Sequence, residues 1–476
     1  MTTADPRRWQ ALALVCVAFF MTVLDVSIVN VALPSIGRSL HFSQTGLQWV
    51  ITAYAITFGG FLLLGGRTGD ILGRKRMFLI GLVVFSAASL VCGLAGSTGV
   101  LIAARAVQGF GAAIVSPSTL SIITTTFDEG AERNKALGIW GAMGGSGAAA
   151  GVLFGGILTK YLGWQWIFFV NVPVGALVLA LAPRVVRESR APGERQGFDV
   201  VGASSVTAGL ALLVYAISKA PVDGWRNGTT IGLLIAAVAL IAFFLVWETR
   251  VENPLMPLSI FRIRTLAGAN IVGVLLGASV FANFFLLTLY VQNVLHFSAL
   301  KTGITFLATA GTTVVVAAVS QWLTTKIGPR IVMAIGLALN TGGLIWYAQI
   351  PVHGSYVRDL LGGYLLVGFG LALAFIPVSI AALAGVGPRE AGLASGLLNT
   401  AQQVGGAIGV AVASSIAVSR ATHLLHSGAS QAAALTSGYS LAFWVIAGVS
   451  AAGVVAALGL VRDSEVGEAE VVEAFS

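Results

Sequence analysis

The sequence predicts an all-α protein that crosses a lipid bilayer many times. Of its 476 residues, 57% are hydrophobic and only 10% are charged, and its mean hydropathy is +0.90. Soluble domains typically carry about a quarter charged residues. The net charge of +8 would suit a nucleic-acid-binding protein, but the basic residues lie in short segments between apolar stretches rather than on one face. We therefore expect a polytopic membrane protein with little room for a separate soluble domain.

Fourteen apolar stretches are long enough to span a bilayer as helices, which takes about 20 residues each. Six come first, at 11–33, 46–66, 77–96, 99–122, 136–159 and 166–183. Two follow at 199–219 and 229–248. Six more lie at 266–292, 303–325, 330–350, 359–384, 392–419 and 438–461.

The distribution of basic residues supports this number of spans. If the N-terminus is inside, 19 of the 27 Lys and Arg residues fall on the inner side and 7 on the outer side, with Arg105 inside a helix. Basic residues accumulate on the cytoplasmic side of membrane proteins. We therefore expect both termini to lie in the cytoplasm.

The chain also repeats itself at an offset of about 258 residues. Gly138, Gly147 and Gly151 are matched by Gly396, Gly405 and Gly409 at identical spacing. An even number of spans separates the copies, so the copies have the same orientation, as in transporters built from parallel repeats. We predict a six-helix bundle in residues 1–190, two inserted helices in 191–258, and a second six-helix bundle with a short acidic tail in 259–476.

Asp25 is the only charged residue between positions 11 and 33. An acid at the centre of a spanning helix costs about 2.5–3.5 kcal/mol on insertion scales, so such acids usually have a function. Burial favours the neutral form of a carboxyl group, so we expect Asp25 to exchange a proton. The repeat offset places it opposite Asn283, and we expect both residues to line a central cavity. The alternative is an acid that serves only helix packing. Because Glu248 and Asp359 fall at helix ends, Asp25 alone is expected to couple protons, one per cycle.

Arg105 is the one basic residue predicted inside a helix, and Gln108 lies on the same helical face. If Arg105 lies near Asp25, its charge favours the ionised acid and promotes proton release. Alternatively, Arg105 extends to the outer membrane surface, because it lies only about six residues into its helix.

The segment GRTGDILGRKR, residues 66–76, follows the second predicted helix. Gly66 and Gly73 allow a tight turn and close helix approach, while Asp70 can pair with arginines such as Arg74 or cap a helix. We interpret this segment as a gating loop whose charge pairs break and re-form during transport. The alternative is a basic loop that only fixes the membrane topology.

The fifth predicted helix carries Gly147, Gly151 and Gly155 at four-residue spacing, a pattern that allows close helix packing. Aromatic side chains can stack on a flat or cationic ligand, and uncharged polar side chains can line a cavity or bond neighbouring helices. On these grounds the candidates for a substrate cavity are Tyr54, Gln108, Trp140, Asn283, Asn399 and Gln402.

Several function classes lack their motifs in the sequence. No GxxxxGK[ST] phosphate-binding loop or serine nucleophile elbow is present, so we expect neither ATP hydrolysis nor enzyme activity. The Cys and His spacings do not suggest a metal site, and the two cysteines, Cys16 and Cys92, imply no disulfide framework.

The Asp25 string LDVSIVNVALP, the loop at 66–76, the segment from Arg105 to Ala113 and the glycine strip resemble the signature motifs of the major facilitator superfamily. Together with fourteen spans, they are similar to its drug:proton antiporter group over essentially the whole chain. In that group, proline usually follows the second glycine of the strip, where this chain has Val152.

The resemblance implies the major facilitator fold and proton-coupled export of lipophilic, often cationic, drugs from the bacterial cytoplasm. By this similarity Asp25 matches the membrane-embedded acid, Asp70 and Arg74 match the gating loop, and Arg105 matches the intramembrane arginine. We expect a monomer in the cytoplasmic membrane that binds a small-molecule substrate and uses no cofactor except the coupling proton, no ATP and no nucleic acid. A dedicated exporter of one metabolite or antibiotic is the alternative within the same fold, and a non-transporting sensor or enzyme is a further one.

Overall fold

The computed structural model describes residues 7–127, 131–190, 199–252, 254–256, 258–384, 386 and 391–462, and all regular structure in this part of the chain is helical. In the first half the helices are α1 (Arg8–Ser39), α2 (Gln44–Leu47), α3 (Trp49–Leu72), α4 (Arg74–Gly93), α5 (Thr98–Thr126), α6 (Ala131–Tyr161), α7 (Trp166–Phe169) and α8 (Asn171–Val185). The inserted pair is α9 (Val200–Asp223) and α10 (Gly228–Glu248). In the second half they are α11 (Arg264–Asn293), α12 (Ala299–Ile327), α13 (Pro329–Tyr347), α14 (Leu361–Leu383), α15 (Ala391–His426) and α16 (Gln431–Leu460).

Within the described residues, 13 helices are long and apolar enough to cross a membrane. The remaining predicted span, at 136–159, falls within the 31-residue helix α6. The predicted all-α polytopic fold is therefore confirmed.

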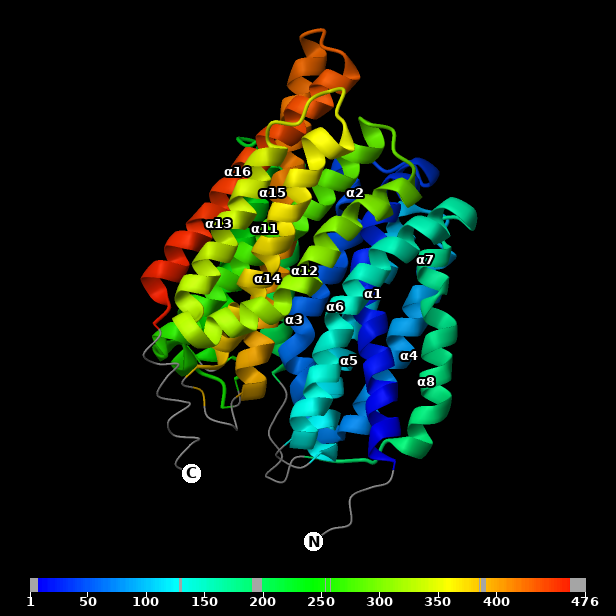
Figure 1. The fold of residues 1–476 in the computed structure, drawn as a ribbon, viewed down its shortest axis with the longest axis vertical. Coiled ribbons are helices and arrows are strands. Elements are labelled where there is room, and N and C mark those ends of the chain that lie inside the picture. The colour runs from blue at the N-terminus through cyan, green and yellow to red at the C-terminus, as the bar shows by residue number, and fades with distance from the viewer. Residues whose placement is uncertain are drawn as a thin grey trace.

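The main departure from the predicted boundaries is at the end of α15. Its span was expected to end at residue 419, but the helix continues to His426 and α16 begins at Gln431. Together they form a hairpin that projects beyond the other helices at the top of Figure 1. The extra turns carry Arg420, His423 and His426, whose polarity ends the hydropathy signal without ending the helix.

The same helix pairing occurs in both halves of the chain. In the first half α1 packs on α6, α3 on α5 and α4 on α5, and in the second half α11 packs on α15, α12 on α14 and α13 on α14. The halves meet through α3 with α15 and α6 with α12, while the inserted pair contacts α3 and α15. This pairing agrees with a parallel repeat, while the domain boundaries at 190 and 258 stay predictions.

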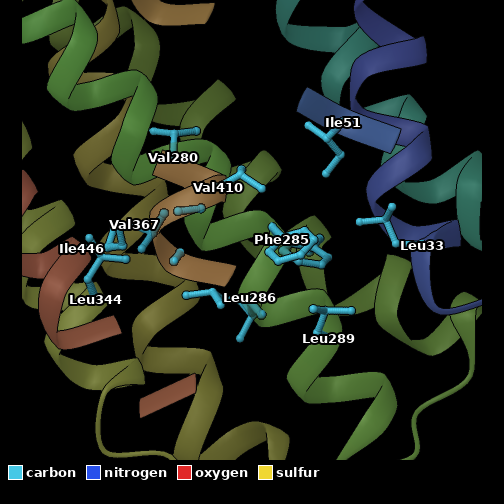
Figure 2. Close-up of a cluster of buried hydrophobic side chains, with 14 of the residues drawn as sticks. Leu33, Ile51, Val280, Phe285, Leu286, Leu289, Leu344, Val367, Val410 and Ile446 are labelled. Carbon is cyan, nitrogen blue, oxygen red and sulfur yellow. The ribbon is translucent and has the colours of Figure 1, made fainter. Parts of the chain in front are cut away.

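We call the end where α1 begins and α16 ends the lower end, and the opposite one the upper end (Figure 1). Near the upper end, one apolar cluster includes residues of both halves. Figure 2 shows Leu33 of α1 and Ile51 of α3 on the right, Val280 of α11 and Val410 of α15 on the left, and Phe285 of α11 between them. The side-chain amide of Gln292 also donates to the carbonyl of Val31 at 2.8 Å. These contacts close the joint between the halves near the upper end.

Candidate functional site

Asp25 lies in the middle of α1 with no exposed surface, and three side chains donate hydrogen bonds to its carboxylate. Arg105 Nη1 lies 2.6 Å from Oδ2, while Gln108 Nε2 and Asn171 Nδ2 each lie 2.8 Å from Oδ1. Hydrogen bonds to the charged form of a carboxyl group, together with a nearby cation, stabilise that form. Each of these three hydrogen bonds is one that a carboxylate oxygen accepts.

Arg105 of α5 is only 2% exposed and connects three helices. Besides the ion pair with Asp25, its Nε donates to the carbonyl of Val50 on α3 at 2.9 Å and its Nη1 to Gln108 Oε1 at 2.7 Å. Its guanidinium lies 4.3 Å from the centre of the Tyr54 ring, a cation–π contact. The structure places Arg105 beside Asp25. The alternative prediction, that its side chain extends to the outer membrane surface, is wrong.

Two residues of this polar cluster were missed in the sequence. Asn171 begins α8, and its amide reaches both Asp25 and Ser89 Oγ, the latter at 3.0 Å. Ser89 of α4 also accepts from Gln108 Nε2 at 3.2 Å and donates to the carbonyl of Phe168 at 2.9 Å. The sequence signal available for Asn171 was its amide in an otherwise largely apolar and aromatic segment, residues 164–173, where the aromatic residues obscured it. We call Asp25, Ser89, Arg105, Gln108 and Asn171 the acid cluster.

The acid cluster lies inside the first half rather than at the joint between the halves. Its members come from α1, α4, α5 and α8, and Arg105 adds the carbonyl of Val50 on α3. Because Asp25 has no exposed surface, it lines no cavity in this conformation, which contradicts that expectation. Asn283 on α11 is also buried, at 2% exposure, and its Oδ1 has no hydrogen-bond partner.

The proposed cavity residues are not gathered in one place. Tyr54 and Gln108 belong to or contact the acid cluster, as described above. Trp140 stacks on Phe19 with ring centres 4.2 Å apart and donates to Thr119 Oγ1 at 3.1 Å. Asn399 is exposed and donates to the carbonyl of Ser395 in its own helix. The role of these residues as a substrate cavity, together with Asn283 and the half-buried Gln402, stays a prediction.

The first turn of α4 binds an acid that the sequence did not indicate. Glu188, just after α8, accepts the backbone N–H groups of Lys75 and Arg76 at 3.1 and 3.0 Å. A carboxylate at this place stabilises the start of α4, because backbone N–H groups and the positive end of the helix dipole are concentrated there. A Cβ at Gly73, whose φ is +114°, would lie 2.7 Å from this carboxylate.

The other residues of the predicted gating loop have fewer described contacts. Gly66 faces Pro117 of α5, to which an added Cβ would come within 3.5 Å. The backbone of Arg74 donates to the carbonyl of Ser189 at 3.0 Å. Asp70 falls in the last turns of α3, and its side chain lies outside the described residues. The gating role of this loop stays a prediction.

The glycine strip of α6 packs against α1, next to the acid cluster. A Cβ at Gly147 would lie 3.1 Å from the Phe20 carbonyl oxygen, and one at Gly155 would lie 2.8 Å from that of Ile28. A Cβ at Gly151 would lie 2.7 Å from the Leu24 carbonyl oxygen. Since backbone atoms leave no room for a side chain, these glycines set the approach of α6 to the helix that carries Asp25.

The second half has a buried polar cluster of a different character. Asn340 of α13 donates to Ser279 of α11 at 3.2 Å and to Ser450 of α16 at 3.0 Å. All three groups are neutral, so this cluster can connect helices but does not exchange a proton at physiological pH. Among the described residues no metal-binding group of His, Cys, Asp and Glu is found either.

Comparison with known proteins agrees with this architecture. A family model described as Major Facilitator Superfamily matches residues 15–410. The chain is 38% identical to the puromycin resistance protein pur8 of Streptomyces alboniger, over 94% of this chain and 90% of that protein. It is 41% identical to the cephamycin export protein CmcT of Amycolatopsis lactamdurans, over 84% and 83% of the two chains. A crystal structure of a POT peptide transporter in complex with sulfate matches with a TM-score of 0.68 at 14% identity, covering 96% of this chain and 95% of that one.

Proposed function

Because the chain belongs to the major facilitator superfamily, a superfamily of membrane transporters, we propose that it exports lipophilic, cationic drugs by proton antiport. The similarity to a puromycin resistance protein and a cephamycin export protein supports export as the direction of transport. The observation that carries proton coupling is the buried Asp25–Arg105 ion pair, at 2.6 Å. The coupling ion is the proton, and no further cofactor and no ATP are used.

Protonation of Asp25 is coupled to a change of structure by the hydrogen bonds around it. Arg105 Nη1, Gln108 Nε2 and Asn171 Nδ2 are all donors. A protonated carboxyl group carries an O–H donor of its own, which has no acceptor in this arrangement. A proton on Asp25 therefore requires the groups around it to rearrange, and in the proposed cycle α1 then changes its position relative to α4, α5 and α8.

In the proposed cycle, the conformation closed near the upper end is the one with ionised Asp25. Opening at the upper end admits an external proton to Asp25 and releases the drug, and return to the first conformation delivers the proton inside. The two halves alternate by rocking, as parallel repeats permit. Each charge that crosses 100 mV contributes about 2.3 kcal/mol.

We place the lower end in the cytoplasm of a bacterial cell, with both termini there, because basic residues collect at that end. The protein then acts as a monomer in the cytoplasmic membrane, and its partners are the small-molecule substrate and the lipid bilayer, with no nucleic acid. This orientation makes the proton gradient across the cytoplasmic membrane the driving force.

A dedicated exporter of a single antibiotic is the second candidate. The two relatives described above are each named for one antibiotic. Among the described residues, Asp25 is paired inside the first half and so presents no carboxylate to a cationic drug in this conformation. A substrate panel of ethidium, puromycin and a cephamycin separates the two candidates.

The test uses energised everted membrane vesicles that contain a pH-sensitive dye, with wild type beside Asp25→Asn. We expect each transported compound to release protons from wild-type vesicles and not from the variant. Asp223→Asn, which changes an exposed acid at the end of α9, is the matched control and should respond like wild type. Proton release that survives Asp25→Asn would reject coupling at Asp25. No release with any compound, in protein shown to be folded and inserted, would reject antiport.

A further inference from the structure

A pair of acids, Asp199 and Glu248, is buried at the lower end of the inserted helices. Asp199 caps the start of α9, and its Oδ1 accepts the N–H of Gly202 at 2.7 Å and the indole N–H of Trp247 at 2.8 Å. Glu248 ends α10, and its Oε2 accepts the N–H of Met256 at 2.9 Å. Both side chains are only 3% exposed.

The other oxygen of each acid, Asp199 Oδ2 and Glu248 Oε1, has no donor. These two oxygens converge on Gly202, where an added Cβ would lie 2.8 Å from Glu248 Oε1 and would collide with Asp199 Oδ2. Both free oxygens therefore lie beside the same point of the α9 backbone, which makes the two carboxyl groups close neighbours. Since neither ionised group can donate, a single proton between them is what satisfies both oxygens.

The charges near the pair also favour one bound proton. Arg67 of α3 interacts electrostatically with both acids, and its Nη1 donates to the carbonyl of Pro254 at 2.6 Å. One added proton removes one of the two negative charges of the buried pair. Buried charges are costly unless they are paired.

The pair lies where the start of α9 contacts α3. Ala203 of α9, next to Gly202, shares an apolar cluster with Leu64 of α3 and Leu255. Protonation of the pair can therefore affect how α9 and α10 are held against α3, the helix that leads into the loop before α4.

We propose that Asp199 and Glu248 form a second proton-binding site, which binds one proton at the lower end and thereby holds the inserted helices against α3. This site is separate from Asp25, because among the described residues none of the hydrogen bonds of the acid cluster reaches Asp199 or Glu248. The transporter then carries two proton sites, in place of the single site expected from the sequence, and the second one responds to the pH at the lower end.

The proposal predicts a protonated carboxyl group near neutral pH. The experiment records the infrared C=O band of protonated carboxyl groups in purified Asp25→Asn protein in lipid nanodiscs, between about pH 6 and 8, where exposed carboxyl groups are ionised. We expect one protonated group that is lost as the pH rises. Adding Glu248→Gln should abolish the band, because the amide can donate to Asp199 in place of the shared proton. Absence of any such band in the Asp25→Asn parent would overturn the proposal.

Two further variants keep the test decisive. Asp199→Asn keeps a capping oxygen for Gly202 and offers an N–H to Glu248, so it should fold and should also abolish the band. Glu252→Gln changes an exposed acid just after α10 and should leave the band unchanged. A band that persists in both Glu248→Gln and Asp199→Asn, or one that Glu252→Gln abolishes, would overturn the proposal. The melting temperature should fall from about pH 6 to 8 in the parent but not in Glu248→Gln.

Discussion

The strongest prediction concerns the ion pair between Asp25 and Arg105, tested by neutralising each residue alone and both together. Asp25→Asn leaves Arg105 as a buried, unpaired cation, and either orientation of the new amide turns its N–H groups toward existing donors. Arg105→Gln leaves a buried carboxylate with amide donors only. Removing one partner of a buried ion pair costs about 3–5 kcal/mol.

The double variant should recover most of this loss. The amide at position 25 can accept from Gln108 and Asn171 with its oxygen, as Asp25 Oδ1 does now. Its N–H group can then donate to the glutamine at position 105. Replacing both members of a buried pair is often close to neutral, so we expect a coupling free energy of several kcal/mol, well above the error of about 0.5 kcal/mol in additivity.

The assay is the melting temperature of the purified protein in detergent, with the double variant expected to melt above either single variant. The matched control is the ion pair between Arg8 and Glu132, at 2.8 Å with side chains 24% and 51% exposed. Its coupling should be at most about 1 kcal/mol, because exposed pairs are screened by water. If the double variant at positions 25 and 105 loses as much as the two single variants combined, the charge argument is refuted.

Three further predictions concern the packing around the acid cluster and the start of α4. Asn171→Leu removes a hydrogen-bond donor to Asp25 and should lower stability by about 1.5–3 kcal/mol. It should also reduce drug-dependent proton release from vesicles. Unchanged proton release would contradict a role of Asn171 in coupling. Gly151→Val should lower stability by about 1–3 kcal/mol or more, because the added side chain overpacks against α1. The melting temperature measures this loss, and Gly99→Ala is the control, because an added Cβ there meets nothing within 4 Å. Equal shifts in melting temperature for the two variants would contradict the steric argument. Glu188→Gln keeps the size of the side chain but removes its charge from the start of α4, which should cost about 0.3–1 kcal/mol. This effect should shrink at high salt, and a salt-independent loss would contradict the electrostatic origin.

The fold could be predicted from the sequence because hydropathy and the distribution of basic residues both depend on local segments. The main boundary error arose where the helix continued beyond the apolar stretch, as at His426 in α15. The repeat was visible because closely packed glycines such as Gly151 and Gly409 have no substitute where backbones meet. Because close backbone contact requires glycine at each such position, the repeat is visible in a single sequence.

The partners of Asp25 were only partly predictable, because they depend on which helices face α1. A lone arginine in an apolar helix pointed to Arg105, since a buried cation needs an anion. Asn171 and Ser89 carry no such charge requirement, and amides and hydroxyls occur in many spanning helices. Their role appears only once α4 and α8 are placed beside α1.

Asp199 and Glu248, the two acids at the lower ends of α9 and α10, show this limit of sequence-based prediction more clearly. Judged from hydropathy, Glu248 lies at the end of a span, where a carboxylate can remain in water at little cost. The structure buries it because α9 and α10 form a hairpin whose lower ends meet, with Asp199 as the cap of one helix and Glu248 as the last residue of the other. Removal from water changes the chemistry of both acids, since their free oxygens then lack donors. A helix-end acid is therefore a candidate for proton binding wherever the hairpin places a second acid beside it, and this condition depends on the tertiary structure alone.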